Sequence, residues 1–361
     1  MIRAVDINGE TVWTTLLGEK HSGVYGAAYS VGFSIIEGNG LLFAGVGLWQ
    51  KEANQMVPGV VALEPATGEV VWTTMLGQGQ SGNGGVRSCI LDQTELVCAG
   101  YLGNAEPGFQ FVADEGTPAV WRLDSQGNIL AENMLEVEGM GQVAKVRKDA
   151  SSGFVLCSTA WSYIEGEDIN AVAVVKISDS LELEWSQMYG VKGGSSQVFD
   201  MLVDNDGNYL LGGHTTVGDG VVNWDYLALK VNSQTQEVEW RNTYGQPRGF
   251  DARYIHDEMY SVGLDNAGNY LLLGGSGDEY SYSEEGQGQW EGWTSDTWGS
   301  YLVVLSPGGE KLYENFYGSK EGNNAGEWLS YDSETGDIMI NTDSDTAPGF
   351  GFLKLSPGTV Y

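Results

Sequence analysis

The sequence predicts an all-β fold, a six-bladed β-propeller made of four-stranded antiparallel blades. A strand-and-turn unit recurs about every 55–60 residues along the chain. The composition, with 53 Gly, 12 Trp and 18 Tyr in 361 residues, is typical of short strands joined by many turns. The chain also begins with a strand of the kind that its last unit lacks, as expected for a closed ring of sheets.

The fourth strand of each unit carries the clearest repeat. It ends in Leu or Tyr, usually followed by Gly, and Trp recurs in its middle at positions 13, 72, 185 and 240. Ala131 and Tyr313 stand at the same position in the other two units. We expect each Trp to pack one blade against the next. These strands are expected at residues 10–18, 69–77, 129–136, 183–190, 238–245 and 312–318.

The second strand of each unit follows a tight turn rich in Asp, Asn and Gly, which supply side-chain-to-backbone bonds and positive φ. The turn Asp204–Asn208 resembles the start of a calcium loop, but turn chemistry explains its residues. The third strands are apolar runs such as VVALEP and LALKVN. Second strands are expected at residues 39–45, 95–100, 153–159, 208–213, 269–275 and 337–342.

The two ends of the chain predict how the ring closes. The last unit, residues 324–361, has three strands and only a stub, Gly358–Tyr361, of the fourth. We expect residues 10–17 to complete that blade and close the ring. Met1–Asp6 reads as a surplus third strand, so the alternative is seven blades with one incomplete. Residues 1–361 then form a single propeller domain.

Two stretches carry a resemblance to known families. VVALEPATGEVVWTTMLG resembles the repeat of PQQ-like, quinoprotein-type propellers, and DNDGNYLLGGHTT with DYLALKVNSQTQEVEWRNTYG resembles repeats of bacterial secreted or lipoprotein-type propellers. The resemblance spans nearly the whole chain and implies blade architecture. Quinoprotein enzymes have eight blades, a longer chain and a vicinal cysteine pair, and this sequence has none of these. We therefore do not expect PQQ or another cofactor, although acidic loops could bind Ca²⁺.

The formal net charge of −32 limits the partners. It disfavours nucleic acid and anionic membranes, and no apolar run approaches the length of a membrane span. The start of the chain shows no signal segment. We favour an extracellular or periplasmic location with the signal removed, with a cytoplasmic one left open, and the acidity suggests a marine or halotolerant setting.

Three cysteines are too few for a disulfide scaffold. Cys98 and Cys157 fall at a repeat position that is apolar in other units, so we expect buried thiols. Because Cys89 and Cys98 flank a tight turn symmetrically, a bridge between them is the alternative.

The long connections predict one functional face. Nearly all of them join second to third strands, as at residues 160–171, or join successive units, and both kinds lie at the same end of an up-and-down blade. The segment 277–299 has three Trp, six carboxylates and no Lys or Arg. Its tryptophans could pack on one another or form a stacking platform. Candidate ligand-binding residues are Trp49, Trp161, Trp224, Trp290, Trp293, Trp298, Arg87 and Tyr101.

Three functions remain open. The first is a binding protein for carbohydrate, acidic or marine polysaccharide in particular, through aromatic stacking and polar contacts. The second is a polysaccharide lyase or another glycan-active enzyme, with His214, His256, Arg253 and Tyr254 as catalytic candidates. A carboxylate-pair glycosidase is a variant, but many pairs are available. The third is a protein-interaction scaffold.

Overall fold

The computed structural model describes residues 1–6, 9–17, 30–50, 52–105, 116–164, 166–216, 223–246, 255–277, 298–318, 322–343 and 350–358. The fold class is an all-β six-bladed β-propeller of four-stranded antiparallel sheets, with no helix in these residues. The predicted fold class is thereby confirmed. The chain divides into two compact units, which are described separately. That residues 1–361 form one domain stays a prediction.

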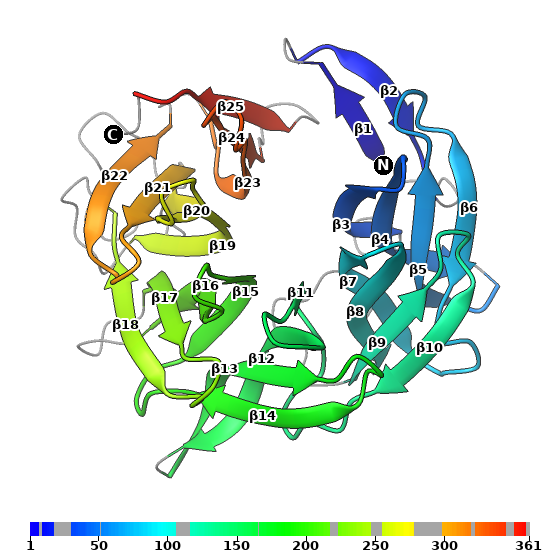
Figure 1. Cartoon of the computed structure of the whole chain (residues 1–361), viewed down its shortest axis with the longest axis horizontal. Coiled ribbons are helices and arrows are strands. Elements are labelled where there is room, and N and C mark those ends of the chain that lie inside the picture. Colours follow the sequence, from blue (N-terminus) through cyan, green and yellow to red (C-terminus); the bar gives the residue numbers. More distant parts are fainter. Residues whose placement is uncertain are drawn as a thin grey trace, which may run out of the picture. The chain divides into compact units, whose positions relative to one another are not determined.

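Unit 1 comprises Met1–Tyr163 and Ala171–Tyr189. Its sheets follow one another in chain order, each with its strands in sequence order (Figure 1). The strands are β1 (Ile2–Val5), β2 (Thr11–Thr15), β3 (Val31–Gly38), β4 (Leu41–Gln50), β5 (Gln55–Leu63), β6 (Val70–Met75), β7 (Asn83–Asp92), β8 (Glu95–Asn104), β9 (Thr117–Leu123), β10 (Ile129–Met134), β11 (Lys145–Lys148), β12 (Phe154–Ile164), β13 (Glu167–Ile177) and β14 (Leu183–Tyr189).

Unit 2 comprises Ile164–Asn170 and Gly190–Tyr361. Two four-stranded sheets are followed by a sheet of three described strands. The strands are β15 (Ser196–Val203), β16 (Tyr209–Thr215), β17 (Asp225–Val231), β18 (Val238–Tyr244), β19 (His256–Leu264), β20 (Tyr270–Gly277), β21 (Gly299–Leu305), β22 (Lys311–Tyr317), β23 (Gly326–Tyr331), β24 (Ile338–Thr342) and β25 (Gly351–Leu355).

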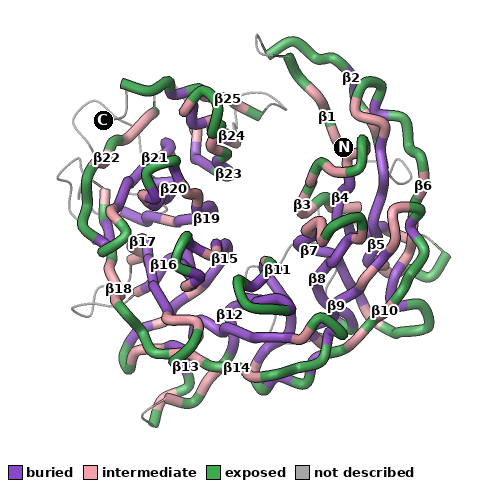
Figure 2. Tube along the Cα trace, viewed as in Figure 1, coloured by how far each residue is buried: buried purple, intermediate pink, exposed green. Residues whose placement is uncertain are grey.

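The middle strands of the sheets form the core. Strands such as β16 and β21 are buried along their whole length, whereas fourth strands such as β6 and β18 remain partly exposed (Figure 2). A strand covered on both faces reads as a continuous apolar run, which is why LALKVN and LVVLSP show no alternation.

The repeated Trp occupies one register position, as predicted. Trp72 lies opposite Ala62, Trp185 opposite Lys176, and Trp240 opposite Lys230. In each pair the Trp on the fourth strand faces the same point of the third strand.

The Trp also joins neighbouring sheets of unit 1. Nε1 of Trp72 donates to the carbonyl of Ser125, in the turn between β9 and β10, at 3.2 Å. A Cβ placed on Gly127, in the same turn, would come within 2.7 Å of the Trp72 ring. Nε1 of Trp13 donates in the same way to Pro65, at 2.8 Å, in the turn between β5 and β6. The packing role predicted for the Trp is therefore confirmed at these two positions.

The tight turns follow the predicted chemistry. Oδ1 of Asp204 accepts hydrogen bonds from the backbone N–H groups of Asp206 and Asn208, at 3.0 and 2.8 Å. Oδ2 of Asp204 lies 3.0 Å from Nζ of Lys230 on the third strand of the same sheet. An equivalent pair joins Asp149 to Lys176, whereas Lys354 pairs with Asp337, which stands at the end of its turn rather than at the start. The carboxylate at Asp204 therefore serves the turn and an ion pair.

The first two strands pair with each other. Trp13 on β2 lies opposite Ala4 on β1, and the last sheet has the order β23–β24–β25. The surplus strand expected at Met1–Asp6 is therefore present. The described strand pairs do not join β2 to β25, so closure of the last blade by residues 10–17 stays a prediction.

The two cysteines of the β7–β8 hairpin form a disulfide. Cys89 lies directly opposite Cys98 with the Cα atoms 4.1 Å apart, and the sulfur atoms are bonded. The expectation of free thiols was wrong for this pair, because direct cross-strand partners bring their Cβ atoms within bridging distance. Cys157 is a buried free thiol, as expected.

One predicted loop is a hairpin arm instead. Residues 160–171 were expected to be a long connection, but β12 continues to Ile164 and β13 begins at Glu167. Trp161 and Tyr163 alternate with less exposed neighbours and are 42% and 73% exposed. This alternation is that of a β-strand, so β12 and β13 continue as a hairpin beyond the buried part of the sheet.

Candidate functional site

The first strand of most sheets contains a one-residue bulge that redirects a side chain. The pairing shifts at Tyr260 in β19, between Met259 and Ser261, and at Glu327 in β23, between Gly326 and Trp328. A bulged residue leaves the regular alternation and is aimed differently from its neighbours. Tyr260 and Glu327 thus occupy equivalent positions in adjacent sheets of unit 2.

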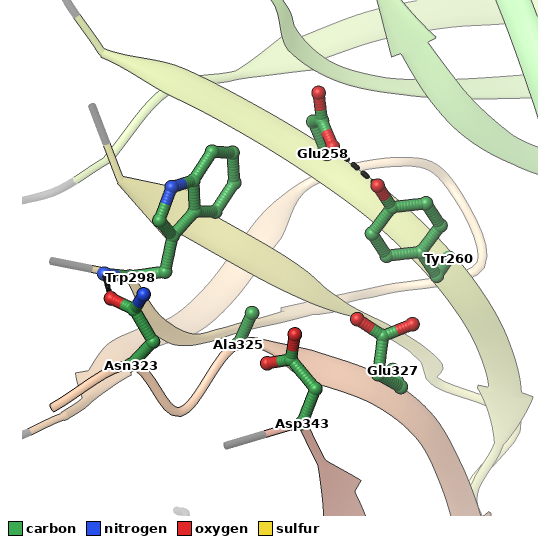
Figure 3. Close-up of a pocket in the computed structure, with 7 residues that line it drawn as sticks. All are labelled: Glu258, Tyr260, Trp298, Asn323, Ala325, Glu327 and Asp343. Atoms are coloured by element: carbon green, nitrogen blue, oxygen red, sulfur yellow. Dashed lines mark hydrogen bonds between the residues drawn. The ribbon is translucent and has the colours of Figure 1, made fainter. Parts of the chain in front are cut away.

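These two residues line a pocket of about 250 Å³ within unit 2 (Figure 3). The pocket lies where β19 and β23 begin and β24 ends, which is the end of the sheets where the long connections attach. The complete lining is Glu258, Tyr260, Trp298, Asn323, Ala325, Glu327 and Asp343.

Trp298 is held in place by glycines and by backbone hydrogen bonds. A Cβ on Gly277 would come within 2.5 Å of the indole, and one on Gly275 within 2.8 Å, so the ring lies against the bare backbone of β20. The backbone N–H of Trp298 donates to Oδ1 of Asn323 at 2.8 Å, and the backbone carbonyl of Trp298 accepts from the N–H of Asn324 at 2.9 Å. The indole is therefore a fixed wall of the pocket.

Three carboxyl groups share the pocket. The hydroxyl of Tyr260 donates to Glu258 (Figure 3). Partial burial of the carboxyl raises the pKa of Glu327 from 4.5 to about 8, with further contributions from the negative charges of Asp343 and Glu258. Much of the Glu327 residue remains open to solvent, while its carboxyl lies among protein atoms beside two other acids. Glu327 is thus largely protonated at neutral pH.

The predicted tryptophans have different surroundings. Trp298 lines the pocket, and Trp161 is exposed on the hairpin arm. Trp49 is half-buried at the end of β4, and Trp224 is half-buried with its ring edge-on to His214 at 4.7 Å. The structure therefore brings only Trp298 into this pocket, among the tryptophans that it describes. Trp290 and Trp293 lie outside the described residues.

The two histidine candidates are buried near each other. His214 is 2% exposed, stacks on Phe199 at 4.9 Å and contacts Oε1 of Gln197 at 3.0 Å through Nε2. Burial, together with the charge of nearby His256, lowers the pKa of His214 from 6.5 to about 3. A neutral, buried ring is out of reach of a polymer. Arg253 and Tyr254, the other catalytic candidates, lie outside the described residues.

Arg87 and Tyr101 are also buried, in unit 1. Arg87 is the bulged residue of β7, donates to Gln142 and lies 5.7 Å from the centre of the Phe33 ring. Burial lowers the pKa of Arg87 to about 10 and raises that of Tyr101 to about 12. Both side chains are therefore part of the packed interior of unit 1, and neither lines the pocket.

Sequence reasoning missed most of the pocket. Glu258, Tyr260, Asn323, Glu327 and Asp343 were not among the candidates. The signal that could have found Tyr260 is its place just before a small or polar residue of the first strand, a place held by Phe33, Arg87 and Phe199 in three other sheets. Glu327 precedes Trp328 and carries no such signal. One-residue bulges break the alternation that would have marked these positions.

The described residues offer neither a metal-binding cluster nor the cysteine pair associated with PQQ. Among the parts of the chain that the structure describes, no group of three His, Cys, Asp or Glu side chains could hold a metal ion. The bridged cysteines are nine residues apart across a hairpin, so they do not form the vicinal pair associated with PQQ in the resembling enzymes. None of the described residues forms a helix able to cross a membrane.

The sequence matches no known protein-family model and no curated protein. Many solved structures resemble the chain in fold, and two of them serve as examples. Quinohemoprotein alcohol dehydrogenase from Comamonas testosteroni aligns with a TM-score of 0.51 and 10% identity, over 94% of this chain and 67% of that chain. A protein of unknown function from Dyadobacter fermentans aligns with a TM-score of 0.55 and 11% identity, over 92% and 96%. The predicted likeness to quinoprotein-type propellers is thus confirmed at the level of the fold.

Proposed function

We propose that the pocket of unit 2 binds carbohydrate. The observation that carries this proposal is the Trp298 indole, held as a fixed wall beside Asn323 and Asp343. Sugar rings have apolar C–H faces that stack on an aromatic ring, and hydroxyl groups that need polar partners at their edges.

The carboxyl groups favour one class of sugar over another. Three acids in one small pocket repel a uronate or a sulfate, and the pKa of Glu327 already reflects their mutual repulsion. We therefore propose a ligand without negative charge, rather than the acidic polysaccharide that the sequence suggested. The volume of about 250 Å³ lies just below the range of about 300–1,000 Å³ for small-ligand pockets, so a short ligand fits better than a long one.

The test is a glycan array followed by calorimetry, in buffers with and without Ca²⁺. Trp298→Ala should raise Kd by at least about tenfold, since central aromatic residues dominate binding energy. Trp161→Ala, which removes an exposed aromatic ring outside the pocket, is the matched control and should leave Kd unchanged. Absence of glycan binding under both conditions would end the proposal, and loss of binding in the control alone would move the site to the hairpin arm.

An extracellular or periplasmic location forms part of the proposal. The Cys89–Cys98 disulfide supports it, because such bonds persist in oxidising compartments. Mass spectrometry of protein isolated from its native cells should find this pair oxidised, and a reduced pair would contradict the location.

A second candidate function is glycoside hydrolysis. Glu327 stays protonated at neutral pH beside ionisable Asp343 and Glu258, and a protonated acid next to a second carboxyl is the arrangement that cleaves glycosidic bonds. Reducing-end assays on any glycan that binds should show turnover, with a loss of at least about a hundredfold in Glu327→Gln. Binding without turnover would exclude hydrolysis and leave carbohydrate binding as the proposed function.

A further inference from the structure

The charge and the aromatic wall of the pocket identify its ligand further, given the carbohydrate binding proposed above. We propose that the pocket selects a sugar that carries a free amine, with the ammonium group among Glu327, Asp343 and Glu258 and the ring face on Trp298.

The first reason is the composition of the wall. The seven lining residues contain three carboxyl groups and no Lys, Arg or His. The lysines of unit 2 that form described ion pairs do so elsewhere: Lys230 with Asp204, Lys311 with Glu314, and Lys354 with Asp337. Glu327 has no counter-ion in the described part of unit 2, so a cationic ligand would supply one.

The second reason is the position of Trp298. Its indole lies against the glycine backbone of β20 on one side and lines the pocket. Cations are attracted to the face of an indole, and the attraction grows when the site is shielded from water. An aminosugar therefore satisfies the ring and the carboxyl groups together, whereas a neutral sugar leaves the acids to repel one another.

Binding of an ammonium group should release a proton. Glu327, with a pKa of about 8, is mostly protonated at pH 7, and the groups that face it are Glu258 and Tyr260 of β19 and Asp343 after β24. The pair that forms is a carboxylate with an ammonium, so the carboxyl proton leaves to buffer. Calorimetry in two buffers with different ionisation enthalpies measures this release directly.

Three β-1,4-linked tetrasaccharides test the proposal, because they share one backbone. The fully deacetylated glucosamine tetramer carries ammonium groups, the N-acetylglucosamine tetramer carries neutral amides, and cellotetraose carries hydroxyls. At pH 7 and 150 mM salt we expect the glucosamine tetramer to bind at least about tenfold more tightly than either neutral one, with proton release only for the first.

Two variants distinguish an effect of the pocket from an effect of the overall negative charge of the protein. Glu327→Gln should abolish the preference and the proton release. Glu310→Gln makes the same substitution at an exposed position of the β21–β22 turn, outside the pocket, and should change neither. Circular dichroism checks that both variants are folded. Equal affinities for the three tetramers, or equal effects of the two variants, would overturn the aminosugar while leaving sugar binding in place. Absence of all binding on this series and on the wider array would overturn both.

Discussion

The contact between sheets of unit 1 gives a stability prediction that rests on Gly127. A Cβ at this position would come within 2.7 Å of the Trp72 ring and of Oγ1 of Thr74, and φ is +84°. Ala in the left-handed region costs about 1 kcal/mol. Displacing the ring removes the Trp72–Ser125 hydrogen bond, worth about 1 kcal/mol, and lost packing adds about 1 kcal/mol more. We expect Gly127→Ala to lower the free energy of unfolding by about 3 kcal/mol.

Gly40→Ala is the matched control. Gly40 has φ of +77° and nothing within 4 Å of an added methyl group, so it bears the backbone cost without the clash. Both changes reduce the entropy of the unfolded chain equally, so the difference between them, about 2 kcal/mol, reports the Trp contact. Urea unfolding monitored by circular dichroism measures both values. Equal losses in the two variants would refute the reasoning that the Trp joins the sheets.

Three further predictions concern a disulfide bond and two titratable groups of known environment. Denatured, non-reduced protein should react with a thiol reagent only at Cys157, and after reduction also at Cys89 and Cys98; replacing both bridged cysteines by Ala should cost about 2.5 kcal/mol for a loop of this length. Because the pKa of His214 is about 3 when folded and 6.5 when unfolded, stability falls by about 1.4 kcal/mol per pH unit as pH drops through that window. His214→Phe should flatten this slope in urea unfolding between pH 6 and pH 4, and an unchanged slope would contradict the burial. Glu327 affects stability in the opposite direction: because its pKa is raised, the stability of the wild type falls as pH rises from 4.5 to about 8. The gain in stability of Glu327→Gln over the wild type should therefore be larger at pH 9 than at pH 5, which thermal melts at the two pH values measure.

The repeat made most of the fold predictable. Trp72 and Trp240 mark the fourth strands, and Asp204 with Asn208 marks a turn, because each of these roles demands a particular residue type. Each position recurs in six units, so a sequence preference that is weak in one unit becomes clear when the units are compared. The extension of β12 to Ile164 was missed, because a hairpin arm and a polar loop share their composition.

The site was less predictable, for a geometric reason. Trp298 was identified from its type and its place in a long connection, but Glu327 reaches the pocket through a bulge, and one inserted residue leaves no trace in a short strand. His214 was misjudged in the other direction: its position at the end of a second strand is right, but its ring turns into aromatic packing with Phe199. Which way a side chain points depends on tertiary packing, which local pattern does not specify.

The most direct test of the proposed binding site is a crystal structure of the protein with the tetrasaccharide that binds most tightly. We expect a sugar ring stacked on Trp298, with its polar groups within hydrogen-bond distance of Asn323, Asp343 or Glu327. A sugar bound only at Trp161 and Tyr163 on the hairpin arm, with this pocket empty at saturating ligand, would contradict it.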